Sequence, residues 1–130
     1  MIRDQIILTS PGQTSNRIYP LEALAAVCEK ANQEMLPVGF MDAEYTPEVS
    51  LDKIMGRVRN ARIENDAVIG DIEIYENSPG YLLFKKLVDA GCDVNFACAG
   101  TGTITESDTD EFTVTEYTPF MVQVHNQSDQ

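Results

Sequence analysis

The sequence has 130 residues and a formal net charge of −12, because 21 Asp and Glu stand against 9 Lys and Arg. The length favours one domain with its own core, and a hydrophobic share of 43% is typical of a globular protein rather than a disordered chain. The acid excess argues against nucleic acid as a partner, since phosphate binding needs a basic face and no Lys or Arg follows Lys86.

The first part of the chain predicts a strand, a helix and a second strand. Residues 5–9 are apolar enough for a short strand. From Pro20 to about Glu34 apolar side chains recur at threes and fours, which predicts a helix that Pro37 ends. Residues 38–41 predict a short buried strand, and 42–50 a loop. The side chains expected on the inner face of the helix are Leu21, Leu24, Cys28, Ala31 and Met35.

Two extended segments joined by a turn are predicted next. Residues 52–62 run extended with Ile54, Val58 and Ile63 inward. A turn at 65–66 leads into 68–75, where Val68, Gly70, Ile72 and Ile74 alternate with Ile69, Asp71 and Glu73 on the wet face. The basic side chains of the first segment are interpreted as its solvated side, with a continuous basic stripe as the alternative: Lys53, Arg57, Arg59 and Arg62.

A second helix is predicted after Ser78, which is a capping residue followed by proline, and Gly91 ends it. Its expected apolar face consists of Leu82, Leu83, Leu87 and Ala90. Strands are expected at 93–97, 112–117 and 120–124. Gly100-x-Gly102 is interpreted as a turn or strand junction, because it is too short for a phosphate loop. The pattern predicts an α+β domain over residues 1–124, a barrel-like sheet with about two packed helices, and a loose tail over 125–130.

Several classes of site and segment are not expected. No run of 18 apolar residues is present, and the N-terminus is too weakly apolar for a secretory signal. Three cysteines without CxxC spacing and a single histidine favour reduced thiols and disfavour a transition-metal site. No cofactor motif is present. The acids Asp108, Asp110 and Glu111 are interpreted as a solvated loop, with weak calcium binding as the alternative.

Cys98 is the one residue that invites a nucleophilic interpretation. It ends an apolar segment, where a buried inert thiol is the usual explanation. A nucleophilic thiolate needs a neighbouring base, and His125, the single histidine, lies near the C-terminus. Taken without any comparison, the residues indicate a compact acidic domain with no convincing active site.

Six segments in register resemble the prohead proteases of tailed bacteriophages, in particular those of T4-like phages. The resemblance covers residues 14–104 and rests on the segments 16–24, 39–43, 47–53, 70–80, 87–91 and 97–102. It implies a herpesvirus-assemblin-like fold, a β-barrel surrounded by helices. It also implies descent from serine proteases that cleave scaffold and capsid proteins inside the immature phage head.

The catalytic positions implied by the resemblance hold residues that do not suit the reaction. The family histidine would fall on Ala43, the serine pair on Ala97 and Cys98, and the adjacent arginine on Ala99. Loss of the base and of the fixed cation would remove general-base help and oxyanion stabilisation. No catalytic residue is therefore expected, and we interpret the chain as a degenerate, inactive protease that binds the phage capsid as a structural protein.

Two other functions stay open. Family members take a third catalytic residue from a strand 25 to 30 positions after the serine, so an active cysteine protease that pairs Cys98 with His125 is one alternative. The other is an acidic phage protein that binds a host factor. The leading hypothesis implies major capsid or other head proteins as partners, a possible homo-oligomer, and no nucleic acid or membrane. It places the protein in the prohead or virion, and in the host cytoplasm during assembly.

Overall fold

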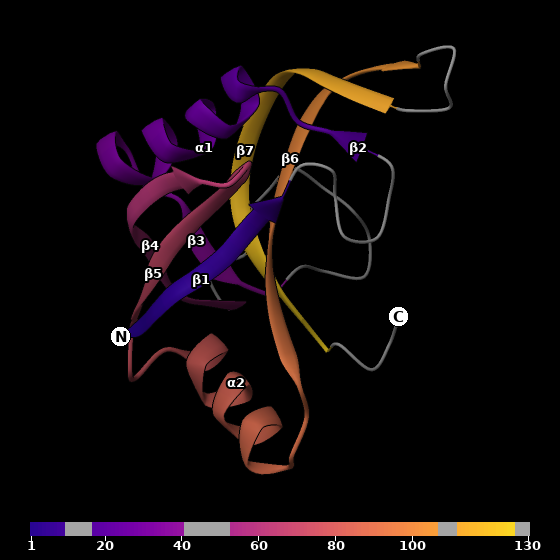
Figure 1. Cartoon of the computed structure of the whole chain (residues 1–130). Helices are drawn as coiled ribbons and strands as arrows, with labels where there is room; N and C mark the ends of the chain where they lie inside the picture. Colours follow the sequence, from indigo (N-terminus) through magenta and orange to yellow (C-terminus); the bar gives the residue numbers. More distant parts are fainter. Residues whose placement is uncertain (10–16, 41–52, 107–111, 127–130) are drawn as a thin grey trace.

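A strongly curled sheet with two helices makes up the molecule (Figure 1). The computed structural model describes residues 1–9, 17–40, 53–106 and 112–126. Its elements in chain order are β1 (Ile2–Thr9), β2 (Arg17–Ile18), α1 (Leu21–Gln33), β3 (Pro37–Gly39), β4 (Ile54–Glu64), β5 (Ala67–Ile74), α2 (Pro79–Asp89), β6 (Val94–Glu106) and β7 (Phe112–Asn126). The expected α+β class with two helices is confirmed.

The strands form one sheet in the order β1-β5-β4-β3-β7-β2, and β6 pairs with β7. The pairings are antiparallel except that β2 and β3 each run parallel to β7. The sheet curls so far that β1 also contacts β6, although no ladder joins them among the described residues. The result is a half-barrel, with α1 packed on β4 and β7 and α2 packed on β4.

The β4–β5 hairpin follows its sequence signals closely. Asn65 and Asp66 both have positive φ, as a two-residue hairpin turn requires. Val68 and Ile72 are fully buried, as their inward positions in β5 predict. In β4 the inward residues are Met55, Val58 and Ala61, whereas Ile63 is 37% exposed and its expected burial is wrong. A bulge between Arg59 and Arg62 causes the change, because it shifts the inward positions by one residue.

Both helices begin and end where the sequence predicts. Helix α1 buries part of the expected face, including Leu24 and Ala31, whereas α2 buries a different one. In α1 the buried residues are Ala23, Leu24, Val27 and Ala31. Leu21 and Met35 are 68% and 40% exposed, so their predicted burial is wrong. Leu21 lies in the first turn, beside the stripe that packs on the sheet, and Met35 follows the last residue of the helix.

Helix α2 is capped as expected, since the Ser78 hydroxyl accepts a hydrogen bond from the Tyr81 amide and Gly91 has φ +84°. Its buried residues are Gly80 and Phe84, whereas the predicted Leu82 and Leu83 are exposed. Gly80 explains the rotation. A Cβ atom there would lie 2.5 Å from a carbonyl oxygen of the sheet, so only this side of the helix can approach so closely.

The last part of the chain differs most from its prediction. In place of three strands and a Gly turn, β6 and β7 are strands of 13 and 15 residues that pair along almost their whole length. Bulges between Ala99 and Gly100 and between Thr101 and Thr103 keep the glycines inside β6. The predicted turn at Gly100 is therefore wrong. β7 also continues through residue 126, past the expected start of the tail.

Candidate functional site

The residues at the resemblance's serine and arginine positions lie together in the inner half of β6. Ala97, Cys98 and Ala99 pair with Gln123, Val122 and Met121 of β7. Ala99 is buried, whereas Ala97 and Cys98 are partly buried, and Cys98 packs against the hydrophobic core. Ala43, at the histidine position, lies outside the described residues.

The thiol of Cys98, which also lines a groove, accepts a hydrogen bond from an aromatic side chain. The Tyr117 hydroxyl donates a hydrogen bond to Cys98 Sγ at 3.5 Å, and the edge of Tyr19 packs against Tyr117 with ring centroids 5.4 Å apart. Burial raises the pKa of the Cys98 thiol to about 12, although the Tyr117 hydrogen bond lowers it in part. A thiol whose pKa is raised in this way is protonated at pH 7, and it is the thiolate that acts as the nucleophile.

His125 does not stand opposite Cys98 in the β6–β7 ladder. The backbone of His125 pairs with Asn95, whereas Cys98 pairs with Val122. The two positions are three residues apart along the ribbon, a rise of about 10 Å between their Cα atoms. The Cys98–His125 dyad stays a prediction. To form it, the two side chains would have to meet across this separation of three residues along the ribbon.

A groove of about 470 Å³ opens beside Cys98, on the face of the β6–β7 ribbon next to β2. Its lining includes Arg17, Tyr19, Gly100, Gly102, Ile104 and Tyr117. Gly100 is required here, because a Cβ atom would lie 2.6 Å from the Tyr117 ring and 2.6 Å from the Thr118 carbonyl oxygen. Gly100 therefore leaves room for the Tyr117 ring, whose hydroxyl bonds to Cys98.

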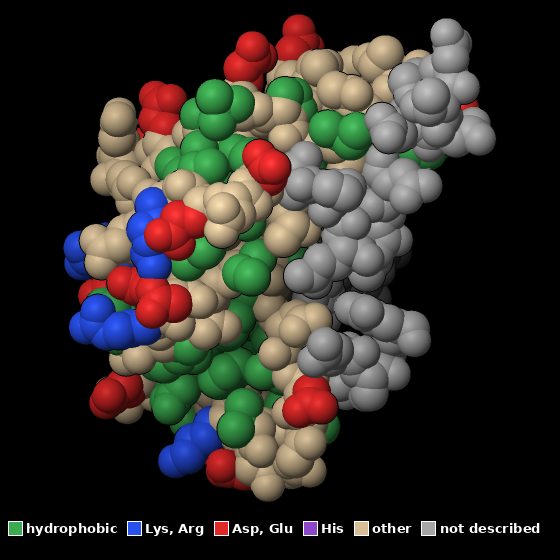
Figure 2. All heavy atoms as spheres, in the orientation of Figure 1, with side chains coloured by type: hydrophobic (Ala, Val, Ile, Leu, Met, Phe, Trp, Pro, Cys, Tyr) green, Lys and Arg blue, Asp and Glu red, His purple; other side chains and the backbone are tan. Residues whose placement is uncertain are grey.

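The basic side chains of β4 are paired with carboxylates. Arg57 and Arg59 each donate from Nε to Glu73 Oε2, at 2.6 and 2.9 Å. These two bonds lower the pKa of Glu73 to about 2. Figure 2 shows most of the blue side chains on the side of β1, β4 and β5, intermixed with red, and a further one near α2. The alternative of a continuous basic stripe is not supported for Arg57, Arg59 and Arg62, because Arg57 and Arg59 share Glu73 and Arg62 pairs with Asp4.

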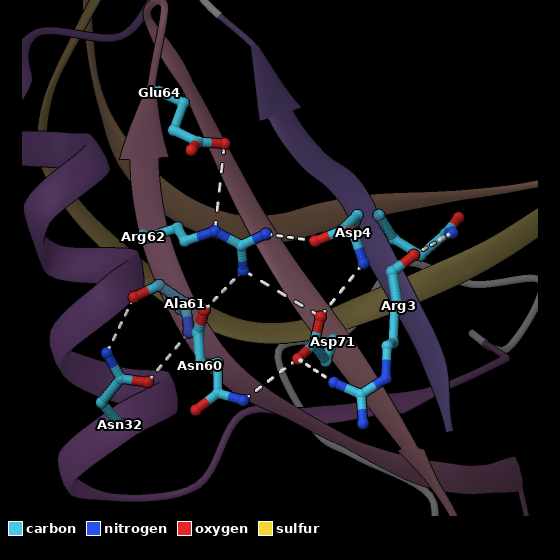
Figure 3. A network of polar contacts seen from close by, with 9 residues as sticks. Arg3, Asp4, Asn32, Asn60, Ala61, Arg62, Glu64 and Asp71 are labelled. Carbon is cyan, nitrogen blue, oxygen red and sulfur yellow. Dashed lines mark hydrogen bonds and ion pairs between the residues drawn. The ribbon is translucent and has the colours of Figure 1, made fainter.

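Asp71 is a buried carboxylate that the sequence pattern placed on the wet face of β5, and this expectation is wrong. Its side chain is 6% exposed (Figure 3). Asp71 Oδ1 accepts from the Asp4 amide and Oδ2 from Asn60 Nδ2, each at 3.0 Å. Arg3 and Arg62 each lie 4.0 Å away and Arg62 also pairs with Asp4. The Asn60 and Asp4 hydrogen bonds hold the pKa of Asp71 below its usual value.

Asp71 connects two bulges, one on each neighbouring strand. Asp4 and Asn60 both have positive φ, at 55° and 52°, and both lie where the register with β5 shifts. Asn32 of α1 also holds β4 here through two hydrogen bonds with the Ala61 backbone, at 2.9 and 3.0 Å. No alternation rule could reveal this cluster, because Asp71 is buried only through residues far away in the sequence.

The described part of the chain offers no metal or membrane-spanning element. Within it, no group of three or more His, Cys, Asp or Glu side chains is arranged to hold a metal ion. None of the described helices is both long and apolar enough to cross a membrane. Asp108, Asp110 and Glu111, the weak calcium candidates, lie outside the described residues.

The fold is similar to that of a phage capsid assembly protease. No protein-family model matches the sequence, and no curated protein matches it at a significant level. Among solved structures, the bacteriophage T4 capsid assembly protease, gp21, matches with a TM-score of 0.72 and 19% sequence identity. The match covers 92% of this chain and 77% of the T4 chain. The prohead-protease-like fold implied by the sequence resemblance is therefore confirmed.

Proposed function

We propose that this protein is a catalytically inactive, prohead-protease-like phage protein that binds the capsid or other head proteins. It would decorate or stabilise the head, or serve as a non-cleaving partner during assembly. Its fold supports a capsid-related role, since the similar T4 protein is a capsid assembly protease. Because proteins of one fold can have different functions, the argument for inactivity rests on the residues of the site.

The state of Cys98 is the observation that carries the proposal. Cys98 stands at a serine position implied by the resemblance, yet its thiol is hydrogen-bonded by Tyr117 and burial raises its pKa to about 12. A nucleophile of this kind needs a lowered pKa or an adjacent base. The neighbouring positions hold Ala97 and Ala99, whose methyl groups can neither donate a hydrogen bond nor supply a positive charge.

A cleavage and binding assay tests the proposal. The purified protein is incubated with the phage's capsid and scaffold proteins, and the products are examined by mass spectrometry while complexes are recovered by affinity capture. We expect capture of a head protein without cleavage. Sequence-specific cleavage that disappears in Cys98→Ala would contradict inactivity, and failure to capture any head protein would contradict the binding role.

The rival function, a cysteine protease using Cys98 and His125, makes an opposite prediction for thiol chemistry. It requires rapid alkylation of Cys98 by iodoacetamide near pH 7, with a midpoint well below that of a free thiol. The raised pKa of the Cys98 thiol instead predicts slow labelling that increases only at strongly alkaline pH. Peptide mass spectrometry distinguishes Cys98 from Cys28 and Cys92, and His125→Ala shows whether any fast labelling depends on the histidine.

A further inference from the structure

The outer half of β6 forms an open edge of the sheet that the described strands make. Residues 101–106 are all exposed, and among the described strands β6 has hydrogen-bonded pairing only with β7. The opposite edge of β7 is different, since β2 pairs there with Phe112 and Thr113. In Figure 1 this part of the ribbon extends away from the helices. An edge of this kind presents backbone N–H and C=O groups to which another chain can pair.

The sequence of this edge carries few of the features that prevent pairing. Proteins commonly protect edge strands with Lys, Pro or short length, but β6 has 13 residues and contains neither residue type. Its two bulges lie between Ala99 and Thr103, so the register from Thr103 to Glu106 is regular. Thr103, Ile104 and Thr105 are β-branched residues that favour extended backbone.

The direction of the backbone groups follows from one contact. Thr103 O accepts a hydrogen bond from Thr115 Oγ1 of β7 at 3.4 Å, so this carbonyl points toward β7. In an extended strand the next residue points its N–H and C=O the opposite way. Ile104, which is 49% exposed, therefore directs its backbone polar groups to the open edge.

The charge of the ribbon favours a basic partner segment over a second copy of this acidic chain. The charged side chains of the described ribbon are Glu106 and Glu116, both negative, and no Lys or Arg follows Lys86. Arg17 of β2, two strands from this edge, lines the groove together with Ile104 and is the one cation among the described residues of that lining. A second copy would bring another charge of −12, whereas a basic segment would be attracted.

We propose that residues 101–106 of β6 accept an extended Lys- or Arg-rich segment of a partner protein as an added β-strand. The inference rests on the proposed binding role and names the kind of partner segment that would satisfy it. Main-chain hydrogen bonds at the open edge supply the affinity, and the negative ribbon selects the basic side chains.

A peptide titration tests the edge directly. The probes are the fluorescein-labelled heptapeptides Lys-Val-Lys-Val-Lys-Val-Lys and Glu-Val-Glu-Val-Glu-Val-Glu, and binding is measured by anisotropy in 50 mM NaCl. We expect the lysine probe to bind at least about tenfold more tightly than the glutamate probe, and to weaken about fivefold in 500 mM NaCl. Equal binding of both probes, or no binding of either, overturns the proposal.

A matched pair of variants at one position separates the backbone contribution from the side chain. Ile104→Pro removes the backbone N–H that points to the open edge, and it leaves the hydrogen bonds between β6 and β7 intact. Proline is tolerated in an edge strand where the missing N–H faces solvent. We expect it to weaken the lysine probe about tenfold, whereas Ile104→Thr, which keeps the N–H, changes binding less than about threefold. Unchanged binding of a folded Ile104→Pro, judged by circular dichroism, overturns the proposal.

Amide hydrogen exchange tests the proposal on the wild-type protein, so that a folding defect of a variant cannot affect the result. Saturating lysine probe should slow exchange in residues 101–106 more than in β1, and slowing confined to β1 overturns the proposal. If sedimentation instead shows a wild-type dimer that Ile104→Pro dissociates, a second copy occupies the edge and the proposal is wrong. Equal capture of head proteins by wild type and Ile104→Pro would leave the binding role intact and refute only the edge.

Discussion

The two ends of the sheet differ in the pairing of their charged side chains and in how far their strands are exposed. At the β1–β5–β4 end, carboxylates and arginines neutralise each other, and the buried Asp71 holds two bulges in place. At the β6–β7 end, the outer part of the ribbon has no cation and all six residues of 101–106 are exposed. The polar side chains of the first end stabilise the fold, whereas the residues of the second end lie exposed to solvent. The following predictions test this difference.

A matched isoleucine pair should show the largest contrast. Ile72 of β5 is fully buried, and Ile104 of β6 is 49% exposed. Ile72→Thr loses apolar contact and buries a hydroxyl, so we expect a loss of about 3 kcal/mol in the free energy of unfolding. Ile104→Thr should change it by less than about 0.5 kcal/mol. Urea denaturation measures both, and similar losses would contradict the comparison.

Removal of the Asp71 carboxylate should have the next largest effect. Asp71→Ala leaves the Asp4 amide and Asn60 without their acceptor, and leaves Arg3 and Arg62 without a shared anion. We expect the melting temperature to fall by roughly 8 °C. Amides of β1 should also exchange faster.

The matched control for Asp71 is Glu64→Ala. Glu64 is a carboxylate 55% exposed and 3.9 Å from Arg62 Nε. We expect its replacement to change the melting temperature by less than about 2 °C, because exposed ion pairs contribute little. Equal effects of the two substitutions would mean that Asp71 has no special role in holding the bulges.

Gly100→Ala should disturb the hydrogen bond from Tyr117 to Cys98. The added Cβ would lie 2.6 Å from the Tyr117 ring, so the ring must move. We expect a loss of about 1.5 kcal/mol from overpacking and faster alkylation of Cys98. Labelling is followed by mass spectrometry, with Thr103→Ala on the exposed part of β6 as control. Unchanged labelling in a destabilised Gly100→Ala would show that Tyr117 does not limit access to the thiol.

The smallest effect concerns Glu73, at the β1–β5–β4 end of the sheet, and the loss of folding stability at acid pH. The folded-state pKa of Glu73 is lowered from 4.5 to about 2, so its stabilising contribution is complete above pH 4.5 and is lost as the pH falls toward 2. Glu73→Gln should therefore reduce stability at pH 7 and flatten the loss between pH 4.5 and 2. Thermal melts at several pH values measure this, and an unchanged slope would contradict the assignment.

Local signals predicted much of the fold. Pro20 and Ser78 mark the helix starts, and Asn65-Asp66 marks the hairpin turn. The alternation of 68–75 predicts a strand with Val68 and Ile72 inward, which is correct, although it places Asp71 on the wrong face. Predictions were wrong where a bulge interrupts the period, as at Asn60 and Gly100, because a shift of one residue exchanges the two faces. The resemblance identified the fold in advance, but not the groove or the hydrogen bond to the thiol.

The sequence by itself determined the class of the domain, the ends of both helices and the acidic, cation-free C-terminal half. These properties depend on residues close together in the chain, through caps, turns and composition. Only the tertiary structure decided that Asp71 is buried, that Tyr117 donates a hydrogen bond to Cys98 and that Asn95 rather than Cys98 pairs with His125. Each of these depends on the register between strands that the chain brings together over long separations, and bulges set that register.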